Sequence, residues 1–506
     1  MLDNYTIEQY KIDIDKNGMN AVWLNILEYN GYKRNHSIFN ISNFGLLYEI
    51  GLAHLNKENK KEQGVYYTPT DVADILVNYF MDLQGENICD VCCGVGNLVL
   101  SYLEKLGYDK ARELIMGGHL YLYDIDGLAL SICKQTIGMI YGTDCLDYIN
   151  CIYGDFLDKN IHLPENSKVI SNPPYFKITK IEKNWENSQI IKDTKEFYSA
   201  FMEKILKESK SSVMITPFSF IGVDKFYSLR ELMNNYNGFI LSFDNMPACI
   251  FNGQKQGVFN TNVSNSVRAA ITVVENKRGE NGFKVSPLLR FTAGERDRLL
   301  KNEVLNGFIP NKYQTVTELC RKYYKCFKEI VPLYFTWVLN SSLDFGDLLT
   351  KEKTEYCLTM PKTCRYYVSA TKRELSRSGK HTLYFNDLYD MEFAYCILNS
   401  SFSYLYWRMF DGSVTFTEGL LKSMPVFCNL LTEEKKGELH NIVQDMISKE
   451  EDYLVYKKNA NEMQENVKYP EEYRDRLNQF LVDVLEIDFD IRKLDIVHSN
   501  TMLDME

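Results

Sequence analysis

Four short apolar runs, each followed by polar or aromatic residues, place the strongest limit on how this chain folds. The runs lead into Asp90, Asp124, Asp155 and Asn172, and a glycine turn and a predicted helix follow the first of them. This alternation predicts an open α/β sheet, in which ligands bind at the carboxyl ends of the strands. Each end alone could be a turn or a helix cap. Four in succession predict one ligand site with convergent polar groups.

The fourth run ends in the stretch Ser171-Asn172-Pro173-Pro174-Tyr175-Phe176. Pro173 and Pro174 fix two φ angles and favour an extended, rigid loop. The side-chain oxygen of Asn172 and the carbonyl of Pro173 can both accept from an NH2 group, and Tyr175 can stack on its ring. The stretch therefore predicts a site for a planar group that carries an amine. The alternative is a Pro-Pro turn with a polar cap.

A glycine turn follows the first run. Gly94 and Gly96 allow a ligand to approach the backbone closely, but Val99 stands where a dinucleotide fingerprint has its third glycine. Asp90 at the strand end suits an ammonium better than a pyrophosphate. The turn therefore favours a nucleoside that bears an amino acid. Asp124, at the end of the second run, has the spacing of an acid that binds ribose hydroxyls.

Two weaker signals lie on either side of this core. Tyr67-Thr68-Pro69 leads into a helix whose first N–H groups suit a carboxylate, although a plain helix cap explains it equally well. Phe251 begins a polar loop. Three further apolar runs, at residues 212–216, 238–243 and 267–274, bring the predicted strands to seven. Their order in the sheet does not follow from the spacing.

Charge is unevenly distributed over the 506 residues. The net charge is −11, which argues against a general nucleic-acid coat. Residues 277–380, however, hold 20 lysines and arginines against 11 acidic residues, a net charge of +9. A polyanion could bind there, where cations, aromatics and hydroxyls alternate, or the segment is a solvated loop. The candidate contact residues are Arg365, Lys372, Arg373, Arg377 and Lys380.

Cysteine and histidine usage points to an intracellular protein without a metal. The chain has thirteen cysteines, an odd number, and seven histidines without metal-ligand spacing. We find no secretory signal and no apolar run long enough to span a membrane. We therefore expect reduced thiols and a cytoplasmic location. The C-terminal segment is charged and helical, typical of a closing arm or an oligomer contact.

With these motifs in order, the chain resembles the gamma class of N6-adenine DNA methyltransferases of restriction–modification type. The resemblance rests on Tyr67-Thr68-Pro69, the glycine turn and Asn172-Pro173-Pro174-Tyr175, with a further similarity over residues 398–426. It implies a Rossmann-like, seven-stranded α/β sheet with a C-terminal target-recognition domain and a helical arm. The implied domains are a helical cap at 1–60, a methyltransferase domain at 61–276, a recognition domain at 277–430 and an arm at 431–506.

The resemblance also implies S-adenosylmethionine as cofactor, with no metal. Thr68, between Tyr67 and Pro69, would lie near the carboxylate of the cofactor, and Asp90 would hold its amine. Gly94 and Gly96 would line the turn, Asp124 would bind ribose, and Ile125 would pack on adenine. Asp155 and Phe156 would read the adenine. Asn172, Pro173, Pro174 and Tyr175 would act on the target base, and Phe251 would stack on it opposite Tyr175.

The expected reaction is methyl transfer to N6 of an adenine turned out of double-stranded DNA. Three alternatives are a protein-glutamine N5-methyltransferase, a cytosine N4 enzyme and a DNA-specificity module without catalysis. The basic segment favours DNA over protein, and Asn172 before the prolines favours adenine over cytosine. A separate partner endonuclease is left open, as are the recognition sequence and the oligomeric state.

Overall fold

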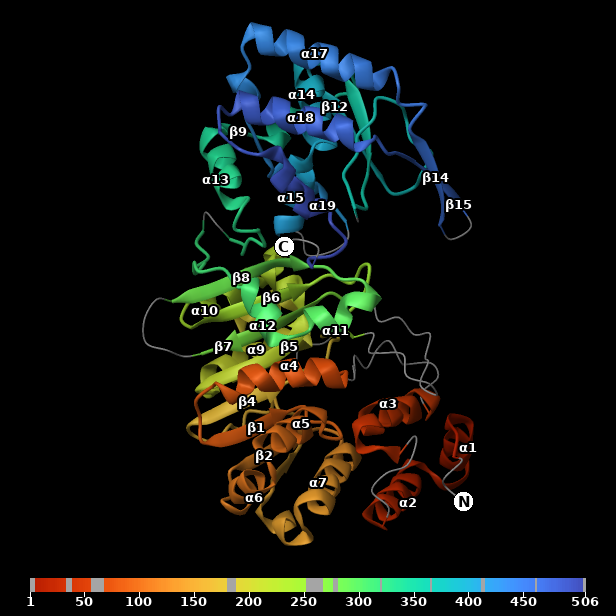
Figure 1. Ribbon diagram of the computed structural model, residues 1–506, viewed down its shortest axis with the longest axis vertical. Helices are drawn as coiled ribbons and strands as arrows, with labels where there is room; N and C mark the ends of the chain where they lie inside the picture. The colour runs from red at the N-terminus through yellow and green to blue at the C-terminus, as the bar shows by residue number, and fades with distance from the viewer. Residues whose placement is uncertain are drawn as a thin grey trace. The chain divides into compact units, whose positions relative to one another are not determined.

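The computed structural model describes residues 5–32, 39–55, 68–179, 188–251, 267–275, 281–318, 321–364, 366–410, 415–459 and 462–503 (Figure 1). It divides into two compact units, Met1–Tyr323 and Tyr324–Glu506. Among the described residues, no helix is both long and apolar enough to cross a membrane.

An eight-stranded sheet forms the centre of the first unit. Its strands are β1 (Asn87–Val91), β2 (Leu120–Asp124), β3 (Asn150–Tyr153), β4 (Ser167–Ser171), β5 (Ser211–Pro217), β6 (Asn237–Phe243), β7 (Ala269–Val274) and β8 (Gly282–Leu289). They lie in the order β3-β2-β1-β4-β5-β7-β6-β8. β7 pairs antiparallel with β5 and β6, and the other pairs are parallel. The predicted Rossmann-like α/β fold and its seven strands are confirmed.

The eighth strand lies in the segment that we expected to open the recognition domain. β8 pairs parallel with β6, and Phe283, Val285 and Leu288 belong to the buried core of the sheet. The compact unit accordingly extends to Tyr323, beyond the expected boundary at residue 276. A net charge averaged over residues 277–380 conceals this strand, because the count adds Lys284 of β8 to the cations on either side and does not register the apolar residues.

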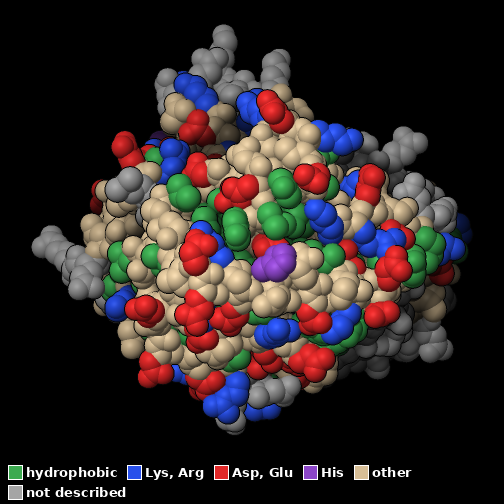
Figure 2. All heavy atoms as spheres, turned by 90° about the horizontal axis from the view of Figure 1, so that it is seen from above, with side chains coloured by type: hydrophobic (Ala, Val, Ile, Leu, Met, Phe, Trp, Pro, Cys, Tyr) green, Lys and Arg blue, Asp and Glu red, His purple; other side chains and the backbone are tan. Residues whose placement is uncertain are grey.

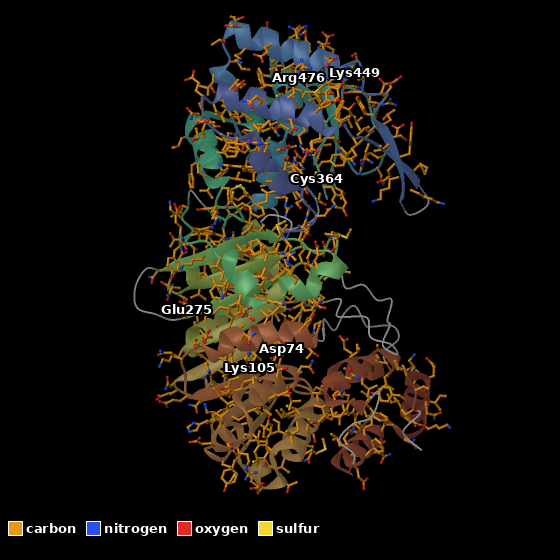
Figure 3. All side chains as sticks on the ribbon, in the orientation of Figure 1. Asp74, Lys105, Glu275, Cys364, Lys449 and Arg476 are labelled. Carbon is orange, nitrogen blue, oxygen red and sulfur yellow. The ribbon has the colours of Figure 1, made fainter. Side chains whose placement is uncertain are left out.

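Two layers of helices cover the sheet. Lys168 of β4 donates to the carbonyl of Phe80, on the face covered by α4 (Thr70–Met81) and α5 (Asn97–Leu106). Its neighbour Val169 belongs to the buried cluster of the opposite face, with α9 (Phe197–Glu208) and α10 (Tyr227–Met233). The other helices are α6 (Tyr108–Met116), α7 (Gly127–Tyr141), α8 (Gln189–Thr194), α11 (Arg296–Leu299) and α12 (Asn302–Gly307). Asp74 of α4 and Lys105 of α5 attract each other across that first layer (Figure 3).

Three helices precede the sheet, α1 (Ile7–Asn17), α2 (Met19–Tyr32) and α3 (Phe44–Leu55). They form a core around Trp23, whose indole N–H donates to the Tyr10 hydroxyl at 3.0 Å. The same core includes Ala129 and Ile132 of α7. The helices therefore pack on the side of the sheet where β2 ends.

The second unit combines helices with short sheets. Its helices are α13 (Val331–Asn340), α14 (Leu388–Asn399), α15 (Ser401–Phe410), α16 (Glu418–Lys422), α17 (Glu433–Ile447), α18 (Glu471–Val484) and α19 (Asp495–His498). Its strands are β9 (Leu343–Asp344), β10 (Leu349–Thr350), β11 (Cys357–Pro361), β12 (Lys380–Phe385), β13 (Pro425–Val426), β14 (Leu454–Asn459) and β15 (Glu462–Val467).

The C-terminal segment contains a β-hairpin in addition to the expected helices. β14 and β15 pair antiparallel between α17 and α18. The two helices are joined by Asp445, which pairs with Lys449 at 2.9 Å and with Arg476 of α18 at 3.1 Å (Figure 3). Leu439, Ile442, Val443 and Met446 of α17 are buried. This segment therefore packs as part of the unit.

Candidate active site

A cavity of about 310 Å³ lies at the carboxyl ends of β1 to β4, where the strand order reverses between β1 and β4. Open α/β sheets bind ligands at this point. The predicted site residues that line it are Thr68, Gly94, Asp124, Ile125, Asp155, Phe156, Asn172, Pro173 and Pro174. Residues from five separate segments of the sequence therefore converge, as the sequence predicted.

The glycine turn after β1 has left-handed backbone at three positions, Cys92 (φ 63°), Gly94 (φ 55°) and Gly96 (φ 97°). A Cβ atom on Gly96 would lie 2.6 Å from the sulfur of Cys133, so only glycine fits there. A Cβ atom on Gly94 would meet nothing within 4 Å. Gly94 thus leaves the backbone open to the cavity, and Gly96 allows α5 to approach α7.

Asp90 lies under this turn and does not line the cavity. It is 0% exposed, and burial raises its pKa to about 8. Its Oδ2 accepts from the backbone N–H of Val99 at 3.0 Å, whereas its Oδ1 has no hydrogen-bond partner among the described residues. Asp90 therefore supports the start of α5. Its predicted contact with a ligand amine stays a prediction.

Two acids at the end of β2, Asp124 and Asp126, accept hydrogen bonds from backbone N–H groups and from a tyrosine hydroxyl. Asp124 accepts from the N–H groups of Gly94 at 2.7 Å and Asp126 at 2.8 Å, and burial raises its pKa. Asp126 caps α7 and accepts from the Tyr48 hydroxyl of α3 at 2.6 Å. Ile125 between them is 68% exposed. An apolar side chain is thus presented between two oriented acids.

Four phenylalanines form one wall of the cavity, Phe156, Phe176, Phe197 and Phe201. The Phe156 and Phe201 rings stack at 5.5 Å, and those of Phe176 and Phe197 lie 4.0 Å apart. The ammonium of Lys204 donates to the carbonyls of Phe156 at 2.6 Å and Asp158 at 3.0 Å. It therefore holds the loop after β3 against α9. A planar, apolar group fits such a wall.

A chain of hydrogen bonds holds Asn172. Its Nδ2 donates to the hydroxyl of Thr68 at 3.0 Å, and the Thr68 carbonyl accepts from Asn97 at 3.0 Å. The Tyr175 hydroxyl lies 2.6 Å from Asn172 Oδ1 and 2.9 Å from the Ile215 carbonyl, so the two acceptors share its one proton. A carboxamide oxygen has two lone pairs, so it can accept from an amine as well as from Tyr175.

Tyr175 and Phe251 lie together just outside the cavity lining. Their ring centroids are 5.9 Å apart, and the ring planes meet at 66°. A base stacked between two parallel rings needs roughly 7 Å between their planes, twice the van der Waals distance of about 3.5 Å. The predicted sandwich of a base between these rings therefore requires Phe251 to move away from Tyr175 and to change its tilt.

Three further predicted site residues lie outside the cavity lining or outside the described residues. Tyr67 and Arg365 lie outside the described residues. Pro69 caps α4 without lining the cavity. Sequence reasoning missed several cavity residues, namely Tyr48, Glu49, Asn97, Asp126, Phe176, Phe197 and Phe201. Asn97, Asp126 and Phe176 had a signal, since each lies within two residues of a motif that was already singled out.

The four candidate DNA-contact residues that the structure describes, Lys372, Arg373, Arg377 and Lys380, contact protein groups of the second unit. Arg373 lies 3.8 Å from Glu465 of β15, and Arg377 donates to the side chain of Asn466. Lys380 pairs with Glu374 at 3.0 Å, and Lys372 donates to the Glu355 carbonyl at 2.8 Å. The described side chains on the face seen in Figure 2 likewise mix both signs of charge. DNA contact by these cations stays a prediction.

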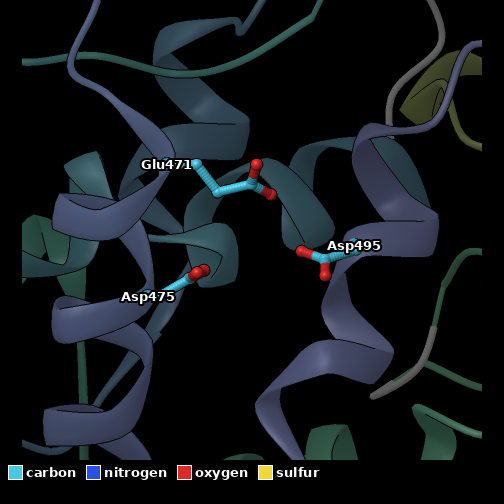
Figure 4. A group of neighbouring side chains, drawn as sticks. All are labelled: Glu471, Asp475 and Asp495. Atoms are coloured by element: carbon cyan, nitrogen blue, oxygen red, sulfur yellow. The ribbon is translucent and has the colours of Figure 1, made fainter.

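An acidic group in the second unit has a nearby cation. Glu471, Asp475 and Asp495 bring one oxygen each within 4.8 Å of the others, the one such group of potential metal ligands among the described residues (Figure 4). Arg474 pairs with Glu471 and lies 3.3 Å from Asp495. The arginine accounts for the cluster without a metal ion.

Known proteins match this region of the chain. The family profile of the N-6 DNA Methylase domain matches residues 40–215. That range runs from α3 to β5 and includes the glycine turn and Asn172. By this match, residues 40–215 form an N-6 DNA methylase domain. The predicted enzyme class, a site-specific adenine DNA methyltransferase, is confirmed.

Three curated relatives are named as a methyltransferase, a methylase subunit and a modification methylase. The chain is 25% identical over 293 residues to the type II methyltransferase M.VspI of Vibrio sp. (strain 343), covering 54% of this chain and 69% of that protein. It is 32% identical over 136 residues to the methylase subunit of the type I restriction enzyme MjaIX of Methanocaldococcus jannaschii, covering 26% of this chain and 22% of that protein. Modification methylase CviBIII of Paramecium bursaria Chlorella virus NC1A is 27% identical over 38% of this chain and 46% of its own length.

Solved structures resemble the chain at low identity. A complex of DrdV with DNA matches 91% of this chain and 50% of its own, with 15% identity and a TM-score of 0.45. A nuclease-deletion mutant of the type ISP enzyme LlaGI, bound to a DNA substrate mimic, matches 88% of this chain and 62% of its own, with 11% identity and a TM-score of 0.44.

Proposed function

We propose that this methyltransferase transfers a methyl group from S-adenosylmethionine to N6 of an adenine turned out of double-stranded DNA. The observation that carries the proposal is the position of Asn172. Its carboxamide lines the cavity, is fixed by Thr68 on one side and contacts Tyr175 on the other. Methyl transfer to an amine requires a fixed hydrogen-bond acceptor that holds the amine beside the methyl donor, and Asn172 has this position.

The residues present fit S-adenosylmethionine. Oriented acids at Asp124 and Asp155 suit ribose hydroxyls and an adenine amine, and the wall that includes Phe156 suits an adenine ring. The open space at Gly94 allows a ligand to lie against the turn. Asp90 Oδ1 is buried without a partner among the described residues but does not line the cavity, so a contact with the methionine ammonium would require the glycine turn above it to shift. When bound, the cofactor would supply an electrophilic methyl group on a sulfonium.

The protein's part in the reaction is to hold the amine. Adenine N6 is a weak nucleophile because its lone pair is delocalised into the ring. Hydrogen bonds from N6 to Asn172 Oδ1 and to the Pro173 carbonyl would favour a tetrahedral nitrogen and direct its lone pair into the cavity. Pro174 keeps both acceptors on an extended, rigid backbone. The amine becomes acidic as the methyl group arrives, so no strong base is needed beforehand.

Stacking would offset the cost of turning the base out of the duplex. That cost is a few kcal/mol, and stacking on an aromatic side chain contributes about 1–3 kcal/mol per base. Tyr175 would provide one face of the stack and Phe251 the other, after the rings separate. The hydroxyl contacts of Tyr175 hold its ring in one plane, so it can receive the base without reorganising.

The proposal includes the remaining parts of the chain. Residues 61–276 would hold most of the methyltransferase domain, 277–430 the target recognition, 1–60 a cap and 431–506 an arm. The cations Lys372, Arg373, Arg377 and Lys380, with Arg365, would contact DNA. A cytoplasmic location brings the enzyme to the DNA and the methyl donor. A separate cognate endonuclease is compatible with the type II and type I names of the relatives.

Transfer of tritium from labelled S-adenosylmethionine to unmethylated duplex DNA tests the proposal. We expect label in DNA and N6-methyladenine after enzymatic digestion. Label recovered as N4-methylcytosine, or in protein instead of DNA, would replace the proposal with the cytosine or the glutamine alternative. DNA binding without any transfer would favour the non-catalytic specificity module. Modification-sensitive sequencing of genomic DNA from cells with and without the chain would then give the recognition sequence.

A further inference from the structure

One buried guanidinium connects the two sides of the proposed target-base site. Arg296 is the first residue of α11, which follows β8, and it is 5% exposed. Its Nε and Nη2 donate to the two carboxylate oxygens of Asp71, at 2.5 Å and 3.0 Å. Two parallel N–H···O bonds of this kind fix the relative orientation of both side chains. Asp71 lies in the first turn of α4, three residues after Thr68.

The other donors of Arg296 bind backbone. Its Nη1 donates to the carbonyl of Cys249 at 3.1 Å, and its Nη2 donates to that of Ile250 at 2.6 Å. These are the two residues directly before Phe251. The same segment is tied once more to the chain after β8, since the N–H of Ala248 donates to the Phe291 carbonyl at 3.1 Å.

We propose that Arg296 is a positioning residue that fixes the backbone directly before Phe251, so that the Phe251 ring stays beside Tyr175 and can receive the target base once the two rings separate. On one side it fixes Asp71, and with it the start of α4 where Thr68 binds Asn172. On the other side it fixes the backbone that carries Phe251. This inference rests on the proposed function and adds a residue to it. Arg296 belongs to the segment that we had read as basic, DNA-contacting chain, yet its cation is buried.

Single substitutions of Asp71 and Arg296 can distinguish this positioning role from that of an ordinary buried ion pair. Removing one partner of a buried pair leaves an uncompensated charge and destabilises the fold. If the Asp71 pair were the whole role, Asp71→Asn and Arg296→Met would both act mainly on stability. If the carbonyl contacts position Phe251, Asp71→Asn keeps them and Arg296→Met loses them. Arg296→Lys keeps the charge but lacks the planar fork that reaches several acceptors at once.

The experiment compares these three variants of the full chain on duplex DNA that carries 2-aminopurine at the target adenine, whose fluorescence reports unstacking of the base. Affinity for S-adenosylmethionine and thermal unfolding are measured in parallel. KM for DNA and kcat are measured on the same duplex with adenine at the target position. For Arg296→Met we expect kcat to fall about 10- to 100-fold and the fluorescence change to diminish, with less than a threefold change in cofactor affinity. Asp71→Asn should stay within about threefold of the wild type in kcat, and Arg296→Lys should lie between.

Arg112→Met serves as the matched control. Arg112 also pairs with a carboxylate, that of Asp144, and donates to a carbonyl, that of Tyr141, but it does not line the active-site cavity. It should lower stability without changing the fluorescence signal.

Equal kcat in Arg296→Met and the wild type, or equal losses in Arg296→Met and Asp71→Asn, would overturn the inference. Absence of transfer by the wild type would instead overturn the proposed function. If Arg296→Met does not fold, Arg296→Lys against Asp71→Asn decides the matter.

Discussion

The side-chain amide of Asn172 donates to the hydroxyl of Thr68 at 3.0 Å, which joins two motifs that lie 104 residues apart in the sequence. Thr68 is buried, and its own carbonyl is held by Asn97 of α5. The orientation of the proposed amine acceptor is therefore set by the segment that precedes α4. In the proposed function, cofactor binding and target-base binding meet in this one contact.

Replacing Asn172 with alanine should abolish methyl transfer and leave S-adenosylmethionine binding nearly intact. The substitution removes an acceptor aimed at the reacting amine, and loss of one such preorganised group costs on the order of 10²–10³-fold in rate. Single-turnover kinetics measure the loss of methyl transfer, and calorimetric titration with the cofactor measures its binding. Loss of cofactor binding together with transfer would show that Asn172 acts on the cofactor site.

Thr68→Val should lower kcat about tenfold, whereas Thr68→Ser should stay close to the wild type. Valine has the shape of threonine but leaves the Asn172 Nδ2 without the acceptor that it has now, and a lost hydrogen bond of this kind costs roughly 1–3 kcal/mol. Steady-state kinetics with both variants provide the test. Equal activity of the valine and serine variants would mean that the hydroxyl does not orient Asn172.

Asp90→Asn should make the stability of the protein less sensitive to a rise in pH between about 4 and 8. Burial raises the folded-state pKa of Asp90 to about 8, above the roughly 3.9 of an unfolded aspartate. Between about pH 4 and pH 8 the unfolded chain has released this proton and the folded protein keeps it. Stability therefore falls as pH rises, by at most about 1.4 kcal/mol per pH unit from this group. Asparagine has no proton to lose, so the stability of the variant relative to the wild type should increase across that window.

Urea unfolding of both proteins at pH 5.5 and pH 8 measures this difference. The same variant reports on the predicted contact between Asp90 and the methionine amine, because that contact needs a carboxylate. If Asp90 makes this contact, Asp90→Asn should lower the affinity for the cofactor tenfold or more. Unchanged affinity would restrict Asp90 to its support of Val99 and α5, and a parallel pH dependence of unfolding in both proteins would contradict the raised pKa.

Local sequence patterns predicted the strand ends well. Asp124, Asp155 and Asn172 were identified because each follows an apolar run, and a parallel sheet brings such ends to one edge whatever the strand order. β8 was not predicted, because an apolar strand inside a basic segment does not change the segment's net charge. Tyr48, Phe197 and Phe201 were not predicted either. Each lies on a helix whose periodicity explains burial, and only tertiary packing places it on the cavity wall.

The same limit explains Arg296. A cation in a basic segment is typical of a DNA contact, and its partners at Asp71 and at residues 249–250 are far away in the sequence. Burial of the guanidinium, which decides its role, depends on the strand that precedes it. Charge counts thus indicated a segment for contact with a polyanion, which stays a prediction, and they did not separate buried cations from solvent-facing ones.

Arg373→Ala should weaken DNA binding and reduce its salt dependence. Arg373 has a side chain that is 30% exposed, and its ion pairs with Glu451 and Glu465 are long, at 3.7 Å and 3.8 Å, so it can exchange them for a phosphate. Loss of one phosphate contact lowers the slope of log K against log salt concentration by about 1. Arg492→Ala is the control, because Arg492 is 84% exposed and pairs only locally with Asp490 among the contacts described. Fluorescence anisotropy with labelled duplex at several salt concentrations gives both slopes. Equal slopes for the Arg373 variant and the wild type would place the DNA contact elsewhere in the chain.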